Sequence, residues 1–298
     1  MPAPLVFDRS LVRLRRQRAY GLGPVTFLID RVAEDLAERL SAVLRRFPLA
    51  VDLGSPTGAV GRVLADSPVI ETIIAVDSSA SSLAGSGLKV VADEELLPFA
   101  DCALDLVVSG LALQSVNDLP GVLVQIRRAL RPDGLFLAAL LGGDTLAELR
   151  HSFAVAETEI EGGLSPRVAP FPDVRDMGAL LQRAGFALPV TDVDRLTVRY
   201  TSPLALLQDL RRMGVGNSLT ERRRVPLRRV TLARMLEVYA TEFADADGKV
   251  RATFDILWLS GWSPHESQQR PLRPGSARTR LADALGTTET SVDEKAGR

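Results

Sequence analysis

The segment from Val51 to Gly58 constrains the fold of this chain more than any other. An apolar run, Leu49 to Leu53, contains Asp52 and is followed at once by two glycines, Gly54 and Gly58. An apolar run of this length predicts a buried strand, and glycines directly after a strand let the backbone approach a ligand at the start of the next helix. We therefore expect a strand, a ligand-binding loop and a helix in succession.

Further apolar runs alternate with helical patterns along the next hundred residues. Strands are expected at 70–76, 89–92, 104–109 and 135–141, and helices at 27–47, 59–65 and 119–130. Short alternation of this kind predicts an α/β fold with a parallel, doubly wound sheet and a ligand site at the carboxyl ends of its strands. Runs at 187–190 and 196–200 predict an antiparallel edge.

The domain organisation can be predicted from the same patterns. We expect an N-terminal helical segment over residues 1–48, which begins with a basic amphipathic helix, and one large domain over 49–277. A helical insert at about 203–241 should interrupt that domain before its last strand. Residues 278–298 are polar and lack aromatic side chains, so we expect a disordered tail.

Composition excludes several classes of function. The 36 basic and 37 acidic side chains nearly cancel, which argues against a general nucleic-acid-binding protein. The single cysteine, Cys102, excludes an internal disulfide and indicates a reducing compartment, so we expect a cytoplasmic protein. With two histidines, His151 and His265, a three-histidine zinc site is impossible, and no metal site is predicted. No run of about 18 apolar residues is present to span a membrane.

A local basic patch contrasts with the balanced overall charge. Eight arginines lie between Arg211 and Arg234, against one acidic residue, Glu221. A solvated arginine-rich helical face is the favoured interpretation. The alternative is a docking surface for an acidic partner, the nascent substrate complex or the inner face of a membrane.

Acidic residues stand at the ends of the first three strands. Any one of Asp52, Asp77 and Asp93 could cap the helix or turn that follows, but three of them together favour a nucleotide site. Asp77 follows Gly54 by 23 positions, a spacing typical of an acidic residue that binds the ribose hydroxyls of an adenosine cofactor. Glu94 lies beside Asp93 and belongs to the same predicted site.

The run that contains Asp52, Gly54 and Gly58 resembles the cofactor loop of class I S-adenosylmethionine (SAM) methyltransferases, D-x-G-x-G-x-G. Pro56 stands where the middle glycine is expected, and proline has a fixed φ and no N–H to donate. The resemblance implies the class I SAM-dependent methyltransferase (Rossmann-like) fold. The proline leaves open whether SAM binds or the loop has lost this capacity.

The same resemblance assigns roles to the other acidic residues. It implies that Asp77 binds the ribose of SAM and that Asp93, with Glu94 beside it, binds the adenine amino group. The predicted cofactor-binding set is therefore Asp52, Gly54, Gly58, Asp77, Asp93 and Glu94.

Longer runs resemble a narrower family, that of the mitochondrial NADH dehydrogenase 1 alpha subcomplex assembly factor 5. These runs are DEELLPF at 93–99, VNDLP at 116–120, LRPDG at 130–134, GGDTL at 142–146 and GW at 261–262 with HESQ at 265–268. The similarity extends from about Phe7 to Ala277. One departure is Gln114-Ser115, which stands where that family has an aromatic-containing pair.

The resemblance implies a protein arginine hydroxylase that acts on the iron–sulfur subunit of NADH:quinone oxidoreductase during complex I assembly. The start of the chain lacks a mitochondrial presequence, which suggests a bacterial relative. An enzyme is the favoured interpretation, and two alternatives stay open. One is an ordinary SAM-dependent methyltransferase of the malonyl-carrier-protein O-methyltransferase type, since methyl transfer needs little more than alignment of donor and acceptor. The other is a non-catalytic assembly chaperone.

Three residues are candidates for catalysis: Asp144, Glu148 and His265. The two carboxylates lie after the fifth strand and could hold a substrate guanidinium through bidentate hydrogen bonds. Equally, Asp144 could cap the helix expected at 146–157, with Glu148 in ion pairs on its surface. A single histidine such as His265 more often makes structural hydrogen bonds than it catalyses a reaction.

Overall fold

A computed structural model describes residues 5–83, 87–269, 280, 282–283 and 286–288. The chain divides into a large compact unit, residues 1–264, and a second unit, residues 265–298. Most of the segment expected to be a disordered tail lies outside the described residues. The predicted domain boundaries therefore stay predictions.

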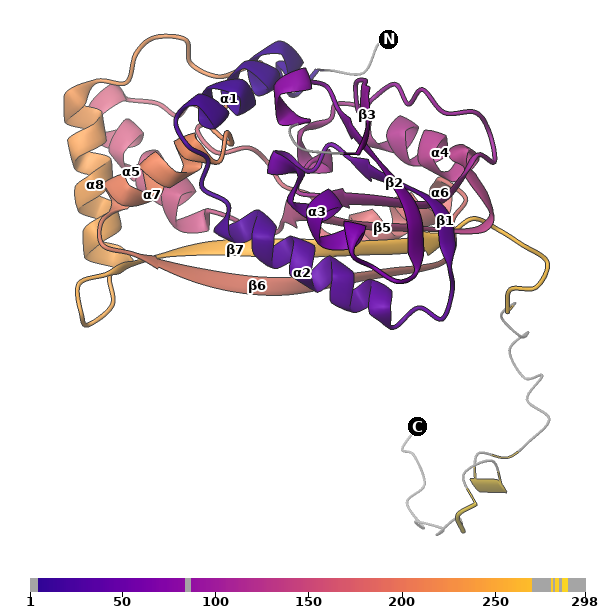
Figure 1. Cartoon of the computed structure of the whole chain (residues 1–298). Coiled ribbons are helices and arrows are strands. Elements are labelled where there is room, and N and C mark those ends of the chain that lie inside the picture. The colour runs from indigo at the N-terminus through magenta and orange to yellow at the C-terminus, as the bar shows by residue number, and fades with distance from the viewer. Residues whose placement is uncertain (1–4, 84–86, 270–279, 281, 284–285, 289–298) are drawn as a thin grey trace. The chain divides into compact units, whose positions relative to one another are not determined.

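The large unit is built on one seven-stranded sheet in the order β3-β2-β1-β4-β5-β7-β6 (Figure 1). Its strands are β1 (Phe47–Leu53), β2 (Ile70–Asp77), β3 (Leu88–Val91), β4 (Leu104–Gly110), β5 (Leu130–Gly142), β6 (Ala187–Tyr200) and β7 (Val250–Trp262). The first five run parallel, whereas β7 is antiparallel to both β5 and β6. The strand order reverses between β1 and β4, and ligands bind α/β sheets at such a point.

Helices cover both faces of the sheet. They are α1 (Arg9–Gly21), α2 (Phe27–Ser41), α3 (Ala59–Ala65), α4 (Leu119–Ala129), α5 (Ala147–Glu161), α6 (Val174–Arg183), α7 (Pro203–Arg212) and α8 (Arg229–Glu242). One buried cluster joins α2, α3, α5 and α8 to the sheet, and a second joins α4 and α6 to the opposite face. Figure 1 shows α5, α7 and α8 grouped at one end of the long strands β6 and β7.

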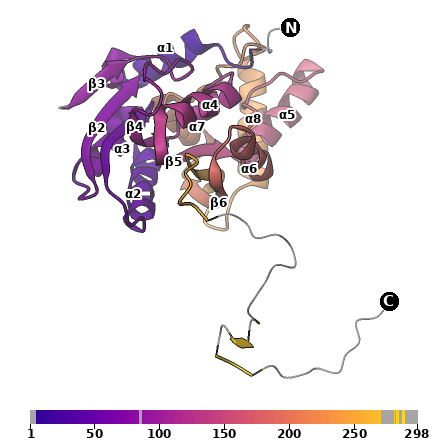
Figure 2. The same ribbon diagram turned by 90° about the vertical axis from the view of Figure 1, so that its right-hand side faces the viewer.

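The N-terminal segment is paired with the helical insert. The N–H of Asp8 donates to the carbonyl of Ser218 at 2.9 Å, and the N–H of Thr220 donates to the carbonyl of Val6 at 2.9 Å. Phe7 and Leu219 form an antiparallel bridge between these bonds. We call α1 together with insert residues 212–222 the cap. Both views of the molecule place α1 on the same side as β3 (Figures 1 and 2).

The structure differs from the sequence patterns in three places. The helix expected over 27–47 ends at Ser41, and the two strands expected at 187–190 and 196–200 are one continuous strand, β6. An edge strand exposes alternate side chains to water, so polar residues interrupt the apolar pattern of β6. The sequence therefore did not indicate one continuous strand. The insert is helical only in α7 and α8, with an irregular segment between them. No helix in the described part of the chain has both the length and the apolar character needed to cross a bilayer.

Candidate functional site

The loop after β1 makes a tight turn that accommodates the proline. Pro56 is the first residue of a short 3₁₀ turn, Pro56–Gly58, a position where an N–H has no helical partner to lose. Thr57 and Gly58 both have positive φ, 60° and 63°. The Ser55 hydroxyl accepts a hydrogen bond from the Gly110 N–H at 2.8 Å, which fixes the loop to the end of β4.

The side chain of Asp52 packs beneath this loop and is not exposed to solvent. Its side chain is buried, and Oδ2 accepts a hydrogen bond from the N–H of Gly61 in α3 at 2.9 Å. Burial raises the pKa of Asp52 to about 6, although hydrogen bonds from Ser55 and Gly61 oppose the shift. The carboxylate therefore ties β1 to the helix that follows the loop.

Asp77 ends β2 with one oxygen unsatisfied. The residue is 2% exposed, and Oδ1 accepts a hydrogen bond from the N–H of Ser79 at 2.7 Å. Oδ2 is buried without a hydrogen-bond partner among the described residues, and Nη1 of Arg16 lies 4.0 Å away. Burial raises the pKa of Asp77, against the opposing charge of Arg16. A buried acceptor without a partner is rare and is suited to a ligand hydroxyl.

The residues after β3 are held by arginines of α1. Glu94 is fully buried, and its carboxylate accepts hydrogen bonds from Arg9 and from Nη1 of Arg16, the latter at 3.0 Å. Asp93 accepts from Arg9 at 2.9 Å and from Arg13 at 3.0 Å. We call these three arginines with Asp77, Asp93 and Glu94 the strand-end cluster.

The charges of the strand-end cluster balance locally. Burial raises the pKa of Asp93, but the N–H of Glu95 and the guanidinium groups of Arg9 and Arg13 outweigh it, so the pKa lies below its usual value. Three cations face the three carboxylates of the cluster, and Arg9 also lies 3.9 Å from Glu95, so most of the negative charge predicted at this edge of the sheet is neutralised by the chain itself.

Gly54 lets the loop approach this cluster closely. Its φ is +70°, and a Cβ added there would lie 3.0 Å from Cγ and Oε1 of Glu94 and 3.1 Å from the Cβ of Ala112. A larger residue would be strained and would also push against the buried Glu94 carboxylate. The loop and the strand-end cluster therefore form one packed site.

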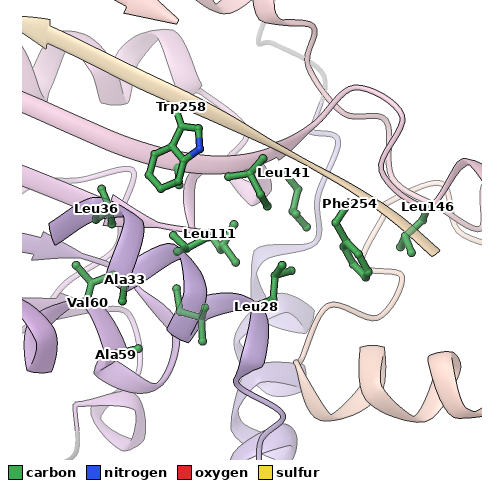
Figure 3. Packing of buried hydrophobic residues seen from close by; sticks show 14 of the residues in the cluster. Leu28, Ala33, Leu36, Ala59, Val60, Leu111, Leu141, Leu146, Phe254 and Trp258 are labelled. Atoms are coloured by element: carbon green, nitrogen blue, oxygen red, sulfur yellow. The ribbon is translucent and has the colours of Figure 1, made fainter. Parts of the chain in front are cut away.

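A pocket opens beside the loop, between α1, α2, the ends of β4 and β5, and the insert. It encloses about 660 Å³ of empty space that includes its open mouth. Leu28, Leu111, Leu141 and Phe254 contribute to its apolar wall, and Figure 3 shows them within one buried cluster. Among the described residues its lining contains no carboxylate, so Asp77, Asp93 and Glu94 are not part of it. The charged residues that line it are two arginines, Arg16 and Arg212.

Two of the candidate catalytic residues, Asp144 and Glu148, are not among the residues that line the pocket. Asp144 is exposed and accepts a hydrogen bond from Arg195 at 2.7 Å, while Glu148 accepts from the hydroxyl of Thr253 at 2.5 Å. His265 belongs to the second unit, where its Nδ1 lies 2.7 Å from the hydroxyl of Ser267. Within the described residues, no three His, Cys, Asp or Glu side chains are grouped as metal ligands.

Sequence reasoning missed the arginines that line and close the site. Arg9, Arg13 and Arg16 follow one another at spacings of four and three residues, which places them on one face of a helix. This spacing in the sequence could have indicated that the three arginines act together. Arg212 gave no comparable signal, because it was one of eight arginines in the predicted patch.

Much of that basic patch is neutralised within the chain. Arg223 and Arg228 pair with Glu161, Arg234 pairs with Glu159 and Glu237, and Arg222 pairs with Asp8. These pairs join the insert to α5 and to the N-terminal segment. The interpretation as a solvated, internally paired helical face therefore accounts for half of the eight arginines.

Comparison with known proteins supports the fold and the family. Residues 51–138 match the model of a methyltransferase domain. The solved structure of the YcgJ protein from Bacillus subtilis covers 78% of this chain and 99% of its own, with a TM-score of 0.55 at 13% identity. At that identity the likeness shows the fold, which is the predicted class I SAM-dependent methyltransferase fold.

Three curated relatives match nearly the full chain. Arginine-hydroxylase NDUFAF5, mitochondrial, from Danio rerio is 40% identical over 93% of this chain and 89% of its own. The Homo sapiens protein of the same name is 41% identical over 91% of this chain and 81% of its own. A malonyl-[acyl-carrier protein] O-methyltransferase from Gallionella capsiferriformans is 34% identical over 87% of this chain and 92% of its own. The first two relatives, together with the fold, show that this chain belongs to the arginine-hydroxylase NDUFAF5 family.

Proposed function

We propose that this protein hydroxylates an arginine of the iron–sulfur subunit of NADH:quinone oxidoreductase during complex I assembly. The observation that carries the proposal is the 40% identity to an arginine hydroxylase over 93% of the chain. The reaction replaces a C–H bond of the arginine by C–OH and so needs an oxidant as co-substrate. The cytoplasmic location expected from the sequence is part of this proposal.

The apolar wall of the pocket suits the aliphatic part of an arginine side chain. An arginine carries a stem of three methylene groups that packs readily against apolar surface. Leu28, Leu141 and Phe254 offer such a surface beside the loop. The guanidinium end is held less well, because the described residues of the pocket lining include two arginines and no carboxylate.

The residues present fit SAM as the cofactor. The unpartnered Oδ2 of Asp77 suits a ribose hydroxyl, and Gly54 allows the backbone to approach closely. Asp93 and Glu94 would border the adenine, since a carboxylate paired with arginine keeps lone pairs for a further donor. Asp52 and Gly58 shape the loop. When bound, SAM supplies an electrophilic methyl group, which is the chemistry required by the alternative function.

One observation favours methyl transfer as the second candidate function. The relative named malonyl-[acyl-carrier protein] O-methyltransferase is 34% identical over 87% of this chain, and the match covers 92% of that relative. The arginine-hydroxylase relatives are more similar to this chain, so hydroxylation stays the first candidate.

The test is mass spectrometry of the iron–sulfur subunit purified from four strains: wild type, a deletion of this protein, and the deletion complemented with Asp77→Ala or Asp101→Ala. We expect one arginine to carry an extra oxygen in wild type, none in the deletion and less in Asp77→Ala. Asp101→Ala is the matched control, since that exposed residue pairs with Arg128 just before the start of β4, whereas the loop contacts the end of β4. Dioxygen or water labelled with heavy oxygen then identifies the source of the atom.

Each other outcome of this experiment selects a different function. An extra methyl group instead of oxygen would assign the chain to the methyltransferases. An unmodified subunit in wild type that fails to assemble in the deletion would leave the chaperone alternative. Full modification in Asp77→Ala would contradict the assignment of the SAM site.

A further inference from the structure

The two arginines of the pocket differ in their partners. Arg16 donates to the buried carboxylate of Glu94, so its charge is compensated. Arg212, the last residue of α7, forms no ion pair within the described residues. Its Nε donates to the carbonyl of Gly23 at 2.8 Å, and its own carbonyl accepts from the N–H of Val25 at 3.3 Å. The guanidinium is therefore positioned at the pocket with its charge uncompensated.

A second unsatisfied group lies in the same lining. The Nε2 of Gln114 donates to the carbonyl of Leu111 at 2.7 Å, which orients the amide. Its Oε1 is buried and has no hydrogen-bond partner among the described residues. Buried acceptors of this kind are normally satisfied, so a ligand with an N–H donor suits the position.

An amino-acid group combines a carboxylate with an ammonium N–H donor and so matches both residues. We propose that Arg212 and Gln114 receive the amino-acid end of the cofactor: Arg212 pairs with its carboxylate, and Gln114 Oε1 accepts from its ammonium group. The inference rests on the proposed SAM site, of which Asp77 holds the ribose end. It makes the insert, through Arg212, part of the cofactor site.

The experiment compares two ligands that share the adenosine part. S-adenosylhomocysteine has the amino-acid end, whereas 5′-methylthioadenosine lacks it. Binding of each to the full chain is measured by isothermal titration calorimetry. We expect Arg212→Gln to weaken S-adenosylhomocysteine by about 10-fold to 100-fold, the effect of losing one charge-assisted interaction, and to leave 5′-methylthioadenosine unchanged. Gln114→Met, which keeps the volume but removes both the acceptor and the N–H donated to Leu111, should have a smaller effect of the same selectivity.

Arg211→Gln is the matched control, because Arg211 precedes Arg212 on α7 and does not line the pocket. It should leave both affinities unchanged. Equal loss of both ligands in Arg212→Gln would overturn the inference, since the residue would then hold the cap in place. No loss of either ligand would overturn it too.

Failure of the proposed function is distinguishable from failure of this inference. If wild type binds neither ligand, the assignment of Arg212 is overturned, while mass spectrometry of the substrate still decides hydroxylation. If both ligands bind with the expected selectivity and the subunit carries no extra oxygen, the inference stands and hydroxylation fails.

Discussion

The strand-end cluster and the pocket share one edge of the sheet but differ in chemistry. The cluster contains three carboxylates with side chains 28% exposed or less, matched by three arginines of α1. The pocket has an apolar wall and an arginine without a carboxylate partner in the described structure. The proposed cofactor site would therefore present acceptors for hydroxyl and amine groups at one end and a cation for an anionic group at the other.

Buried charge also makes the two regions differ in how they are stabilised. In the pocket, apolar burial contributes to folding whether or not a ligand is present. In the cluster, each buried carboxylate depends on its partner, because breaking a buried ion pair leaves an uncompensated charge. Substitutions in the strand-end cluster should therefore lower the stability of the fold more than substitutions in the pocket lining.

The largest expected effect is that of Arg9→Ala. Glu94 is fully buried, and the side chain of Arg9 is 11% exposed, so the substitution leaves part of a buried charge uncompensated. We expect a loss of about 3 to 5 kcal/mol in the free energy of unfolding, measured by urea denaturation. Arg13→Ala is the control, since its side chain is 38% exposed and should cost less than about 1 kcal/mol. Equal losses for the two variants would remove the distinction between buried and exposed partners.

A smaller effect is expected at Asp52, which packs beneath the loop between the two regions. Its pKa is raised to about 6, above the value of about 3.9 in an unfolded chain. The folded state therefore binds the proton more tightly, and this contribution to stability is lost as pH rises through about 6. Asp52→Asn, which does not ionise, should gain about 2 to 3 kcal/mol relative to wild type between pH 4 and pH 7. A pH-independent difference in unfolding free energy would show that the carboxylate is not desolvated.

The smallest effect is expected on the pocket side, at Pro56. Because its missing N–H has no helical partner at the start of the turn, Pro56→Gly should change the affinity for S-adenosylhomocysteine less than about threefold. Stability should fall by about 0.4 to 1 kcal/mol, because glycine gives the unfolded chain more conformations. A large gain in affinity, measured by calorimetry, would indicate instead that the proline impairs the loop.

The sheet and the acidic part of the proposed site could be predicted from the sequence. Apolar runs that alternate with helical patterns predict the parallel strands. Asp77, Asp93 and Glu94 stand out in the sequence because they are acidic residues at or just after the ends of these runs. The arginines that neutralise them could not be assigned, because the position of α1 depends on how the whole chain packs. Asp144 and Glu148 were named for their charge, and contacts with Arg195 and Thr253 across the sheet are invisible in local patterns.

The pairing of residues 6–8 with residues 218–220 has a consequence for how the protein is made. A ribosome that adds 5 to 20 residues per second needs on the order of 10 to 40 s to synthesise the chain between these two segments. During that time the first segment leaves the ribosome without its partner, although the parallel strands can already assemble. Contacts of such high sequence separation form late. The nascent chain can therefore assemble its five parallel strands before residues 6–8 pair with residues 218–220, whereas β7 is synthesised after both segments.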